Sequence, residues 1–419
     1  MPSDTGPDQS SPRCDGPYAP IEAKIGRVGA HLCRSLRHVL AAVPGAPRRP
    51  VELSRALRVN HDLASKTLLA TSKPDPLAAA HSMPGPEALR TLLKAARRRK
   101  IDKALIAVAE EAVREFESLL RDDVGSRAEL DAVLSAWLPE ARRRFEASNK
   151  QLAFKANCNL KGVVAEVGLT AVLFHPADDQ VNCDAVGIMG RMGLRRLRPG
   201  VPICFSARHS GPKASSFAWE TLEGARVDFP QSNVLLNEFC SQPMPKLEIS
   251  MADDAIHYRI ARNGIGPKSA VNVFLAQVVR NALDRYRRPE APRRKGVGTE
   301  VEIPTKTMVL DVLLHESVWP GCPPELVIYD TVIRGRANVN DQSRLIDRMD
   351  LSESIQFLGQ GTARFRIAEV PNYVELIRNV CDKLGWASEK FRGYRCRISY
   401  PFYGSQVSMV FDLPNPPAE

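Results

Sequence analysis

The sequence predicts an α+β protein in which an all-helical N-terminal region precedes a mixed region of strands and helices. Two observations support this prediction. Up to about residue 150, apolar residues recur every three or four positions, which is the spacing of amphipathic helices. From about residue 154, short strand-like runs replace this pattern and only a few helical segments interrupt them.

The composition is that of an ordinary globular protein. The 419 residues are 44% hydrophobic and 25% charged, a length that suggests two or three domains. A net charge of +10 favours an anionic partner such as nucleic acid. Nine scattered cysteines without a Cys-x-x-Cys pair indicate reduced thiols, and no apolar run approaches the roughly 18 residues of a membrane span. We therefore expect a cytoplasmic protein without membrane contact.

The N-terminal residues 1–20 are rich in Pro, Ser, Asp and Gly. They lack the apolar core of a signal peptide and cannot bury enough apolar surface to fold alone. We expect a disordered tail.

Residues 52–66 have the pattern of two short helices joined by a tight turn. Pro50 suits the first turn of a helix, and Leu53 and Leu57 lie one turn apart on a shared inner face. Asn60 is a strong N-cap for the second helix. The expected inner face of this second helix consists of Ala64, Thr67 and Leu68, and its outer face of His61, Asp62, Ser65 and Lys66.

A preceding helix is expected over residues 30–43, which makes a three-helix domain over residues 21–80. Residues 25–72 resemble the helix-turn-helix domains of bacterial one-component transcription regulators, including the IclR-like group. The resemblance implies a second helix that enters the major groove of double-stranded DNA. The residues that would face bases or phosphates are Asn60, His61, Asp62, Ser65 and Lys66.

The segment departs from this family in two ways. Arg58 occupies the turn position that is usually Gly, and no basic β-hairpin follows to form a wing. The alternative interpretation is a structural pair of helices that does not touch DNA.

Residues 81–150 read as further helices, over 86–100, over 102–121 and from a capping box at 126–129, with a restart at Pro139. We expect them to link the domains and to form a homodimer. Arg97, Arg98 and Arg99 are candidates for phosphate contacts beside the DNA site, with a solvated helix face as the alternative.

The second region is predicted to contain eleven strands and two helices. The helices are expected at 233–240 and 373–384, and residues 400–405 are expected to connect a hairpin. The strands are expected at 168–175, 185–192, 201–206, 246–251, 256–260, 271–279, 308–315, 325–333, 355–358, 394–400 and 406–413.

The two halves of this region, residues 151–285 and 299–419, echo each other across a basic linker. The runs 171–175 and 311–315 are similar, and both end in histidine. The sequence predicts a duplicated α+β lobe with a cleft between its copies, which is a natural ligand site. Chance similarity between short apolar strands is the alternative.

Signatures of chemistry are sparse. Nucleophile-elbow, zinc-protease and phosphate-loop motifs are absent from the sequence, so we expect no enzyme, cofactor or metal. The run 187–193 has glycines three apart without Gly-x-Gly, and we expect it to end a strand. His175 and His315 could bind a metal or sense pH. No third potential ligand lies at a spacing that would indicate a metal site, so ordinary histidines at the ends of strands are favoured.

Four arginines are candidates for binding a small anionic effector, because guanidinium groups bind carboxylates and phosphates in fork geometry. They follow strands at similar places in the two halves: Arg191 and Arg195 in the first, Arg334 and Arg336 in the second. A solvated surface is the alternative.

The main hypothesis is a DNA-binding transcription regulator, dimeric, with a C-terminal region that senses a ligand or a partner protein. Two alternatives stay open. One is an enzyme with a catalytic cleft in the double lobe, and the other is a non-catalytic interaction protein.

Overall fold

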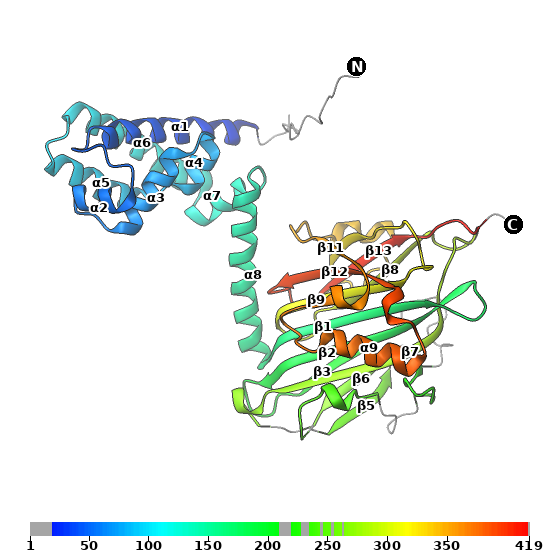
Figure 1. Ribbon diagram of the computed structural model, residues 1–419. Coiled ribbons are helices and arrows are strands. Elements are labelled where there is room, and N and C mark those ends of the chain that lie inside the picture. Colours follow the sequence, from blue (N-terminus) through cyan, green and yellow to red (C-terminus); the bar gives the residue numbers. More distant parts are fainter. Residues whose placement is uncertain are drawn as a thin grey trace, which may run out of the picture. The chain divides into compact units, whose positions relative to one another are not determined.

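The computed structural model describes residues 19–208, 219–227, 234–243, 246–252, 255–261 and 264–417. The chain forms two compact units, Met1–Phe145 and Glu146–Glu419. The first is helical and the second is rich in strands, as the α+β prediction requires (Figure 1). Most of the expected N-terminal tail, residues 1–18, lies outside the described residues. No helix within the described ranges has the length and apolar character to cross a lipid bilayer.

The helical unit has one hydrophobic core to which all of its helices contribute. Leu36, Leu53, Leu89 and Phe116 are fully buried in this core. The segments 21–80 and 81–150 are therefore not separate in the structure, because the second packs its apolar stripes against the first. The helices are α1 (Ala19–Ala41), α2 (Pro50–Leu57), α3 (His61–Ser72), α4 (Pro76–Ser82), α5 (Pro86–Arg98), α6 (Lys103–Ser118), a π-helical turn (Leu119–Val124) and α7 (Arg127–Leu134).

The first helix is longer than the sequence predicts. It was expected over residues 30–43, but α1 begins at Ala19 because Ile25 and Val28 extend its apolar face. The helix α4 follows α3 directly, where a winged domain would have a β-hairpin. Pro139 starts α8 (Pro139–Lys161), as expected.

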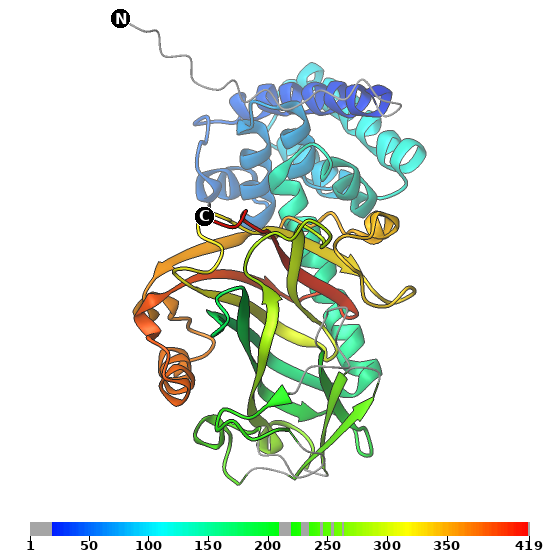
Figure 2. The same cartoon turned by 90° about the vertical axis from the view of Figure 1, so that its right-hand side faces the viewer.

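A seven-stranded sheet is the centre of the second unit, with strand order β11-β12-β9-β1-β2-β7-β4 (Figures 1 and 2). The central strands β1 and β9 are parallel, and β1 is antiparallel to β2. The strands are β1 (Val163–Pro176), β2 (Asn182–Arg196), β4 (Trp219–Glu220), β7 (Val271–Asp284), β9 (Thr305–His315), β11 (Ile355–Gln360) and β12 (Phe391–Ser399).

Two three-stranded sheets complete this unit, with strand orders β3-β6-β5 and β10-β13-β8. One face of the large sheet packs against α9 (Tyr373–Leu384). The intervening residues along its strands point to the opposite face, where they pack against the small sheets. The strands of the small sheets are β3 (Ile203–Arg208), β5 (Leu247–Ala252), β6 (Ala255–Ile260), β8 (Arg294–Glu300), β10 (Glu325–Asp330) and β13 (Ser405–Asp412).

The two halves differ from the expected pair of separate lobes. They share one continuous sheet, in which the similar runs 171–175 and 311–315 lie on adjacent parallel strands. Their connections differ as well: β2 pairs with β1, whereas β10, which follows β9, belongs to another sheet.

Three local predictions in this unit need correction. The helix expected at 233–240 is a single turn at Asn237–Phe239 in the part that the structure describes. Residues 400–405 do not connect a hairpin, because β12 and β13 belong to different sheets and Tyr400, at φ 53°, turns the chain between them. The expected linker contains the strand β8, which pairs with β13.

Candidate nucleic-acid interface and internal cavity

The turn between α2 and α3 has the backbone conformation that the sequence pattern requires. Arg58 ends α2 in the left-handed region, at φ 56° and ψ 47°. The Asn60 side chain accepts a hydrogen bond of 2.8 Å from the Asp62 backbone N–H, so Asn60 is the N-cap of α3. Ala64 and Thr67 are fully buried, and Leu68 is half-buried, as expected for the inner face.

The outer face of α3 holds the predicted DNA-reading residues. His61 is exposed, and Ser65 is half-buried. Lys66 is exposed and pairs with Asp62 at 2.8 Å, so a phosphate would have to compete with this carboxylate. Asn60 lies beside them, but its carbonyl oxygen is already engaged in the cap.

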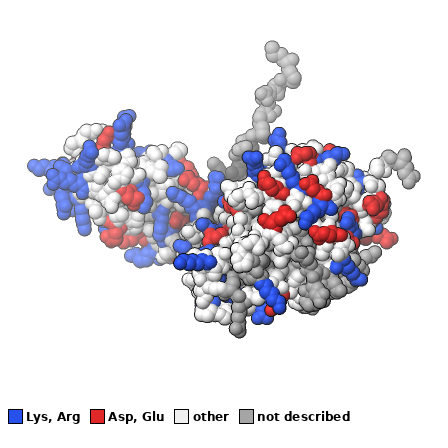
Figure 3. Space-filling view, turned by 60° about the horizontal axis from the view of Figure 1, so that its bottom comes forward, with Lys and Arg blue, Asp and Glu red and all other residues white. Residues whose placement is uncertain are grey.

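Positive charge is concentrated in the helical unit. Residues 19–145 contain 23 Lys and Arg against 15 Asp and Glu, which is a net +8 of the chain's +10. Figure 3 shows these side chains gathered at the end of the helical unit where α2 and α5 lie in Figure 1. Arg98 and Arg99 are exposed there, and Arg97 shares the carboxylate of Glu110 at 2.8 and 3.0 Å.

The four arginines proposed for an effector do not form one cluster. Arg191 is buried and donates to the carbonyls of Leu169 and Gly190, both at 3.1 Å. Arg195 pairs with Glu166 at 2.9 Å. The other two lie in the loop after β10.

Arg334 and Arg336 have different surroundings in that loop. Arg334 is within 3.7 Å of Asp347, and Arg336 lines a cavity. The loop is held by the buried Arg344, which donates to the carbonyls of Gly335 and Arg336 at 2.6 and 2.8 Å. Arg336 also borders a larger open hollow of about 930 Å³, along with Arg288, Arg294 and Lys295.

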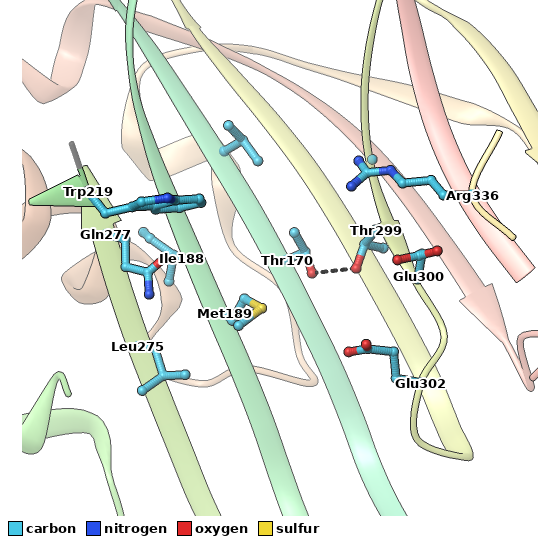
Figure 4. Close-up of a pocket in the computed structure, with 13 residues that line it drawn as sticks. Thr170, Ile188, Met189, Trp219, Leu275, Gln277, Thr299, Glu300, Glu302 and Arg336 are labelled. Carbon is cyan, nitrogen blue, oxygen red and sulfur yellow. Dashed lines mark hydrogen bonds between the residues drawn. The ribbon is translucent and has the colours of Figure 1, made fainter. Parts of the chain in front are cut away.

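The cavity lies beside the large sheet and has a volume of about 110 Å³. Residues from both halves of the unit line it, but the halves share one sheet, so it is not the expected cleft between two separate lobes. Figure 4 shows Trp219 and Gln277 on one side and Glu300, Glu302 and Arg336 on the other, with Thr170 between them. The hydroxyl of Thr170 donates to that of Thr299 at 2.9 Å, which ties β1 to β8 across this space.

Gly187 forms part of the cavity floor. It pairs with Gln277 on β7 and with Val172 on β1, so it lies between two longer side chains. A Cβ atom added at Gly187 would meet no atom within 4 Å. The Gly-containing run 187–193 therefore lies within β2 and does not end it, and its first glycine leaves room above the sheet.

Gln277 carries a buried polar group that no described residue satisfies. Its side chain is only 3% exposed. Within the described residues, its amide nitrogen Nε2 has no hydrogen-bond partner. Buried donors are rarely left in this state, because the lost hydration is not replaced.

His175 and His315 come together, as the ends of adjacent strands. Their rings are 4.8 Å apart between centroids, and His175 stacks on Trp386 at 4.7 Å. Burial, followed by the charge of His175, lowers the pKa of His315 to about 4. In the described ranges, no group of three or more His, Cys, Asp or Glu residues could hold a metal ion.

A buried ion pair lies on the other face of the sheet, next to α9. Arg395 binds both carboxylate oxygens of Asp311, at 2.8 and 2.7 Å, and the Tyr373 hydroxyl donates to the same carboxylate at 2.7 Å. Arg395 also donates to the carbonyls of Phe365 and Arg366. The full hydrogen bonding of this group indicates a structural role.

The sequence pattern missed most of the cavity. Gln277 is a polar residue within the apolar run 271–279, and Gly187 is a glycine within a strand, and both were available signals. Trp219, Thr170 and Thr299 carry no local signal, since their roles depend on strand pairing.

Comparison with known proteins adds little. No protein-family model matches the chain, and no curated protein matches it. Among solved structures it is similar to one from Parabacteroides distasonis that is provisionally described as a protease, at 8% identity and a TM-score of 0.26. The alignment covers 60% of this chain and 41% of that chain, so it spans less than half of that protein. A likeness this low carries no argument about fold or activity.

Proposed function

We propose that the protein is a DNA-binding transcription regulator, in which α2 and α3 form a helix-turn-helix and the strand-rich unit senses a ligand or a partner protein. The observation that carries the proposal is the α2–α3 pair, with Asn60 as N-cap and an exposed outer face on α3. An exposed second helix held by a tight turn is the geometry that enters a major groove.

The charge distribution supports a nucleic-acid partner. The helical unit has most of the net positive charge, and Arg98 and Arg99 are exposed at the α5–α6 turn. Contacts from such residues to phosphates supply affinity that does not depend on sequence, and they release counterions. The side chains on α3 would then supply base contacts.

Dimerisation is part of the same proposal. Leu152 and Leu160 lie eight residues apart on α8 and are 62% and 75% exposed, respectively. Residues eight apart lie on similar faces of a helix, so a second copy could cover both. Light scattering on the full chain measures the molecular mass in solution, and we expect that of two chains.

The test is selection of duplexes from a random-sequence library by the full chain, followed by binding titrations at several salt concentrations. We expect a recovered site with two half-sites about one helical turn, or a multiple of it, apart. The slope of log affinity against log salt is negative, and Arg98→Ala should reduce its magnitude by about 0.9 for the phosphate contact that it removes. Arg287→Ala, an exposed site in the strand-rich unit, is the matched control and should leave the slope unchanged.

Asp62 gives a sharper test of which helix meets DNA. Asp62→Asn removes a negative charge from the outer face of α3 and releases Lys66, so it should tighten binding. Asp382→Asn, on the exposed surface of α9, should not. The proposal fails if the intact protein retains no duplex at low salt, or if both Asp variants have the same effect.

A further inference from the structure

We propose that the cavity between the large sheet and β8 binds an uncharged single-ring heterocycle that carries a hydrogen-bond acceptor on one edge and N–H donors on another. Pyrimidine bases and related lactams are of this class. The inference deepens the ligand-sensing part of the proposed function and depends on it for its biological role. The site itself is argued from the cavity alone.

The buried amide of Gln277 requires an acceptor. Its Nε2 is unpartnered among the described residues and belongs to a side chain that lines the cavity. A carbonyl oxygen or a ring nitrogen placed above Gly187 would accept this hydrogen bond and restore what burial has removed. This is the requirement that separates the cavity from a simple packing defect.

The size of the cavity limits the ligand to one ring. Its volume is about 110 Å³. For comparison, an enclosed cavity of about 150 Å³ in a protein core holds benzene. The present space is smaller but partly open, so it can take one ring that reaches its open side and has no room for two. Gln277 and Val172 flank Gly187 on adjacent strands, which places them about 9–10 Å apart at a strand spacing near 4.8 Å. A single flat ring fits this width.

The lining determines the polarity of the ligand. Trp219, Met189 and Leu275 supply an apolar wall, which suits the face of an aromatic ring. On the opposite side, the carboxylates of Glu300 and Glu302 can accept N–H groups (Figure 4).

The charges around the cavity balance. Arg336 lines it together with the two glutamates, and the buried Arg191 is close enough to Glu302 for their charges to interact. Among the described residues, these two positive and two negative groups favour an uncharged ligand over the anionic effector that the arginine pattern suggested.

Direct titration of the full chain by calorimetry tests the inference, with uracil as the probe. We expect saturable binding of uracil, binding at least about tenfold weaker for 1,3-dimethyluracil, whose N–H donors are blocked, and none for the benzoate anion. Absence of saturable uracil binding, or equal binding of all three compounds, overturns the inference.

Two variants locate the binding. Gly187→Val fills the floor where a Cβ meets no atom, so the fold should be kept while uracil binding is lost. Gln277→Leu should weaken binding about tenfold, whereas Gln356→Leu, at an exposed position of β11, should not. If Gly187→Val retains both its unfolding temperature and full affinity, uracil binds elsewhere and the inference is wrong.

The outcomes for the two proposals are separable, because uracil binding is measured without DNA. If the protein binds uracil but retains no duplex, the ligand site is supported and the proposed function as a DNA-binding regulator is wrong. DNA binding in a protein that does not bind uracil removes only this inference.

Discussion

Replacement of Gln277 by leucine should stabilise the strand-rich unit, which is unusual for a substitution in a buried position. The amide nitrogen is unpartnered among the described residues, and the side chain is 3% exposed. An unsatisfied buried donor costs about 1–3 kcal/mol. Leucine has a similar volume and no polar atoms, so Gln277→Leu should raise the free energy of unfolding by about 1–2 kcal/mol.

Gln406 is the matched control, because it is also 3% exposed but fully bonded. It accepts from the Ala337 N–H at 2.8 Å, and it donates to the Ala337 carbonyl at 3.0 Å and to Ser408 at 3.1 Å. Gln406→Leu leaves these three buried groups without partners. We expect it to lower the free energy of unfolding by about 2–4 kcal/mol.

Urea unfolding followed by tryptophan fluorescence measures both effects. Three of the four tryptophans, Trp219, Trp319 and Trp386, lie in the strand-rich unit, so its transition dominates the signal. At about 2–4 °C per kcal/mol, the two variants should also differ clearly in unfolding temperature. The reasoning is refuted if Gln277→Leu destabilises as much as Gln406→Leu, since the amide would then be satisfied.

Three further predictions concern stability. The pKa of His315 is about 4 in the folded protein and near about 6.5 in the unfolded chain. The unfolded chain therefore takes up a proton first as the pH falls, so the stability present above pH 6.5 is lost progressively toward pH 4. His315→Gln should remove this pH dependence, on the order of 2 kcal/mol, in unfolding curves at pH 7 and 4.5. Tyr373→Phe removes one hydrogen bond to Asp311 and should lower the free energy of unfolding by about 1–2 kcal/mol. Arg395→Met leaves Asp311 as an unpaired buried charge and should lower it by about 3–5 kcal/mol. Urea unfolding measures both changes. Arg58→Gly should raise the free energy of unfolding of the helical unit by about 1 kcal/mol, because glycine adopts the left-handed conformation of this position without strain. Unfolding followed by circular dichroism measures the change, and an unchanged or lower stability would contradict the prediction.

Local patterns predicted the elements well, because their causes lie in neighbouring residues. The caps at Asn60 and Ser126 and the restart at Pro139 are local effects, and all three occur where the sequence placed them. Short runs rich in apolar and β-branched residues likewise located β1 and β7, the strands on either side of Gly187, most of whose residues are buried on both faces. The missed strand β8 is short, basic and Gly-containing, and it exists because β13 pairs with it.

Pairing between distant strands is what the sequence could not supply. The similarity of 171–175 to 311–315 suggested two separate lobes, but those runs pair in register within one sheet. Both descriptions satisfy the same apolar periodicity, because periodicity determines which face is buried and not which strand is adjacent. The cavity depends on this adjacency, since Thr170 and Thr299 meet only when β8 lies across β1.

The loop between β10 and β11 connects the cavity to α8 within the strand-rich unit. Arg336 in this loop lines the cavity, and Arg344 clamps the loop backbone. Further along the same loop, Ser352 donates its backbone N–H and its hydroxyl to Glu146 of α8, at 3.0 and 2.6 Å. If the loop has two arrangements, a ligand that contacts Arg336 can therefore shift the equilibrium between them and so change how the loop holds α8. The shift in free energy equals the difference in the ligand's affinity for the two arrangements. A sensing role for the unit requires that difference, and a tight ligand without it would bind and regulate nothing.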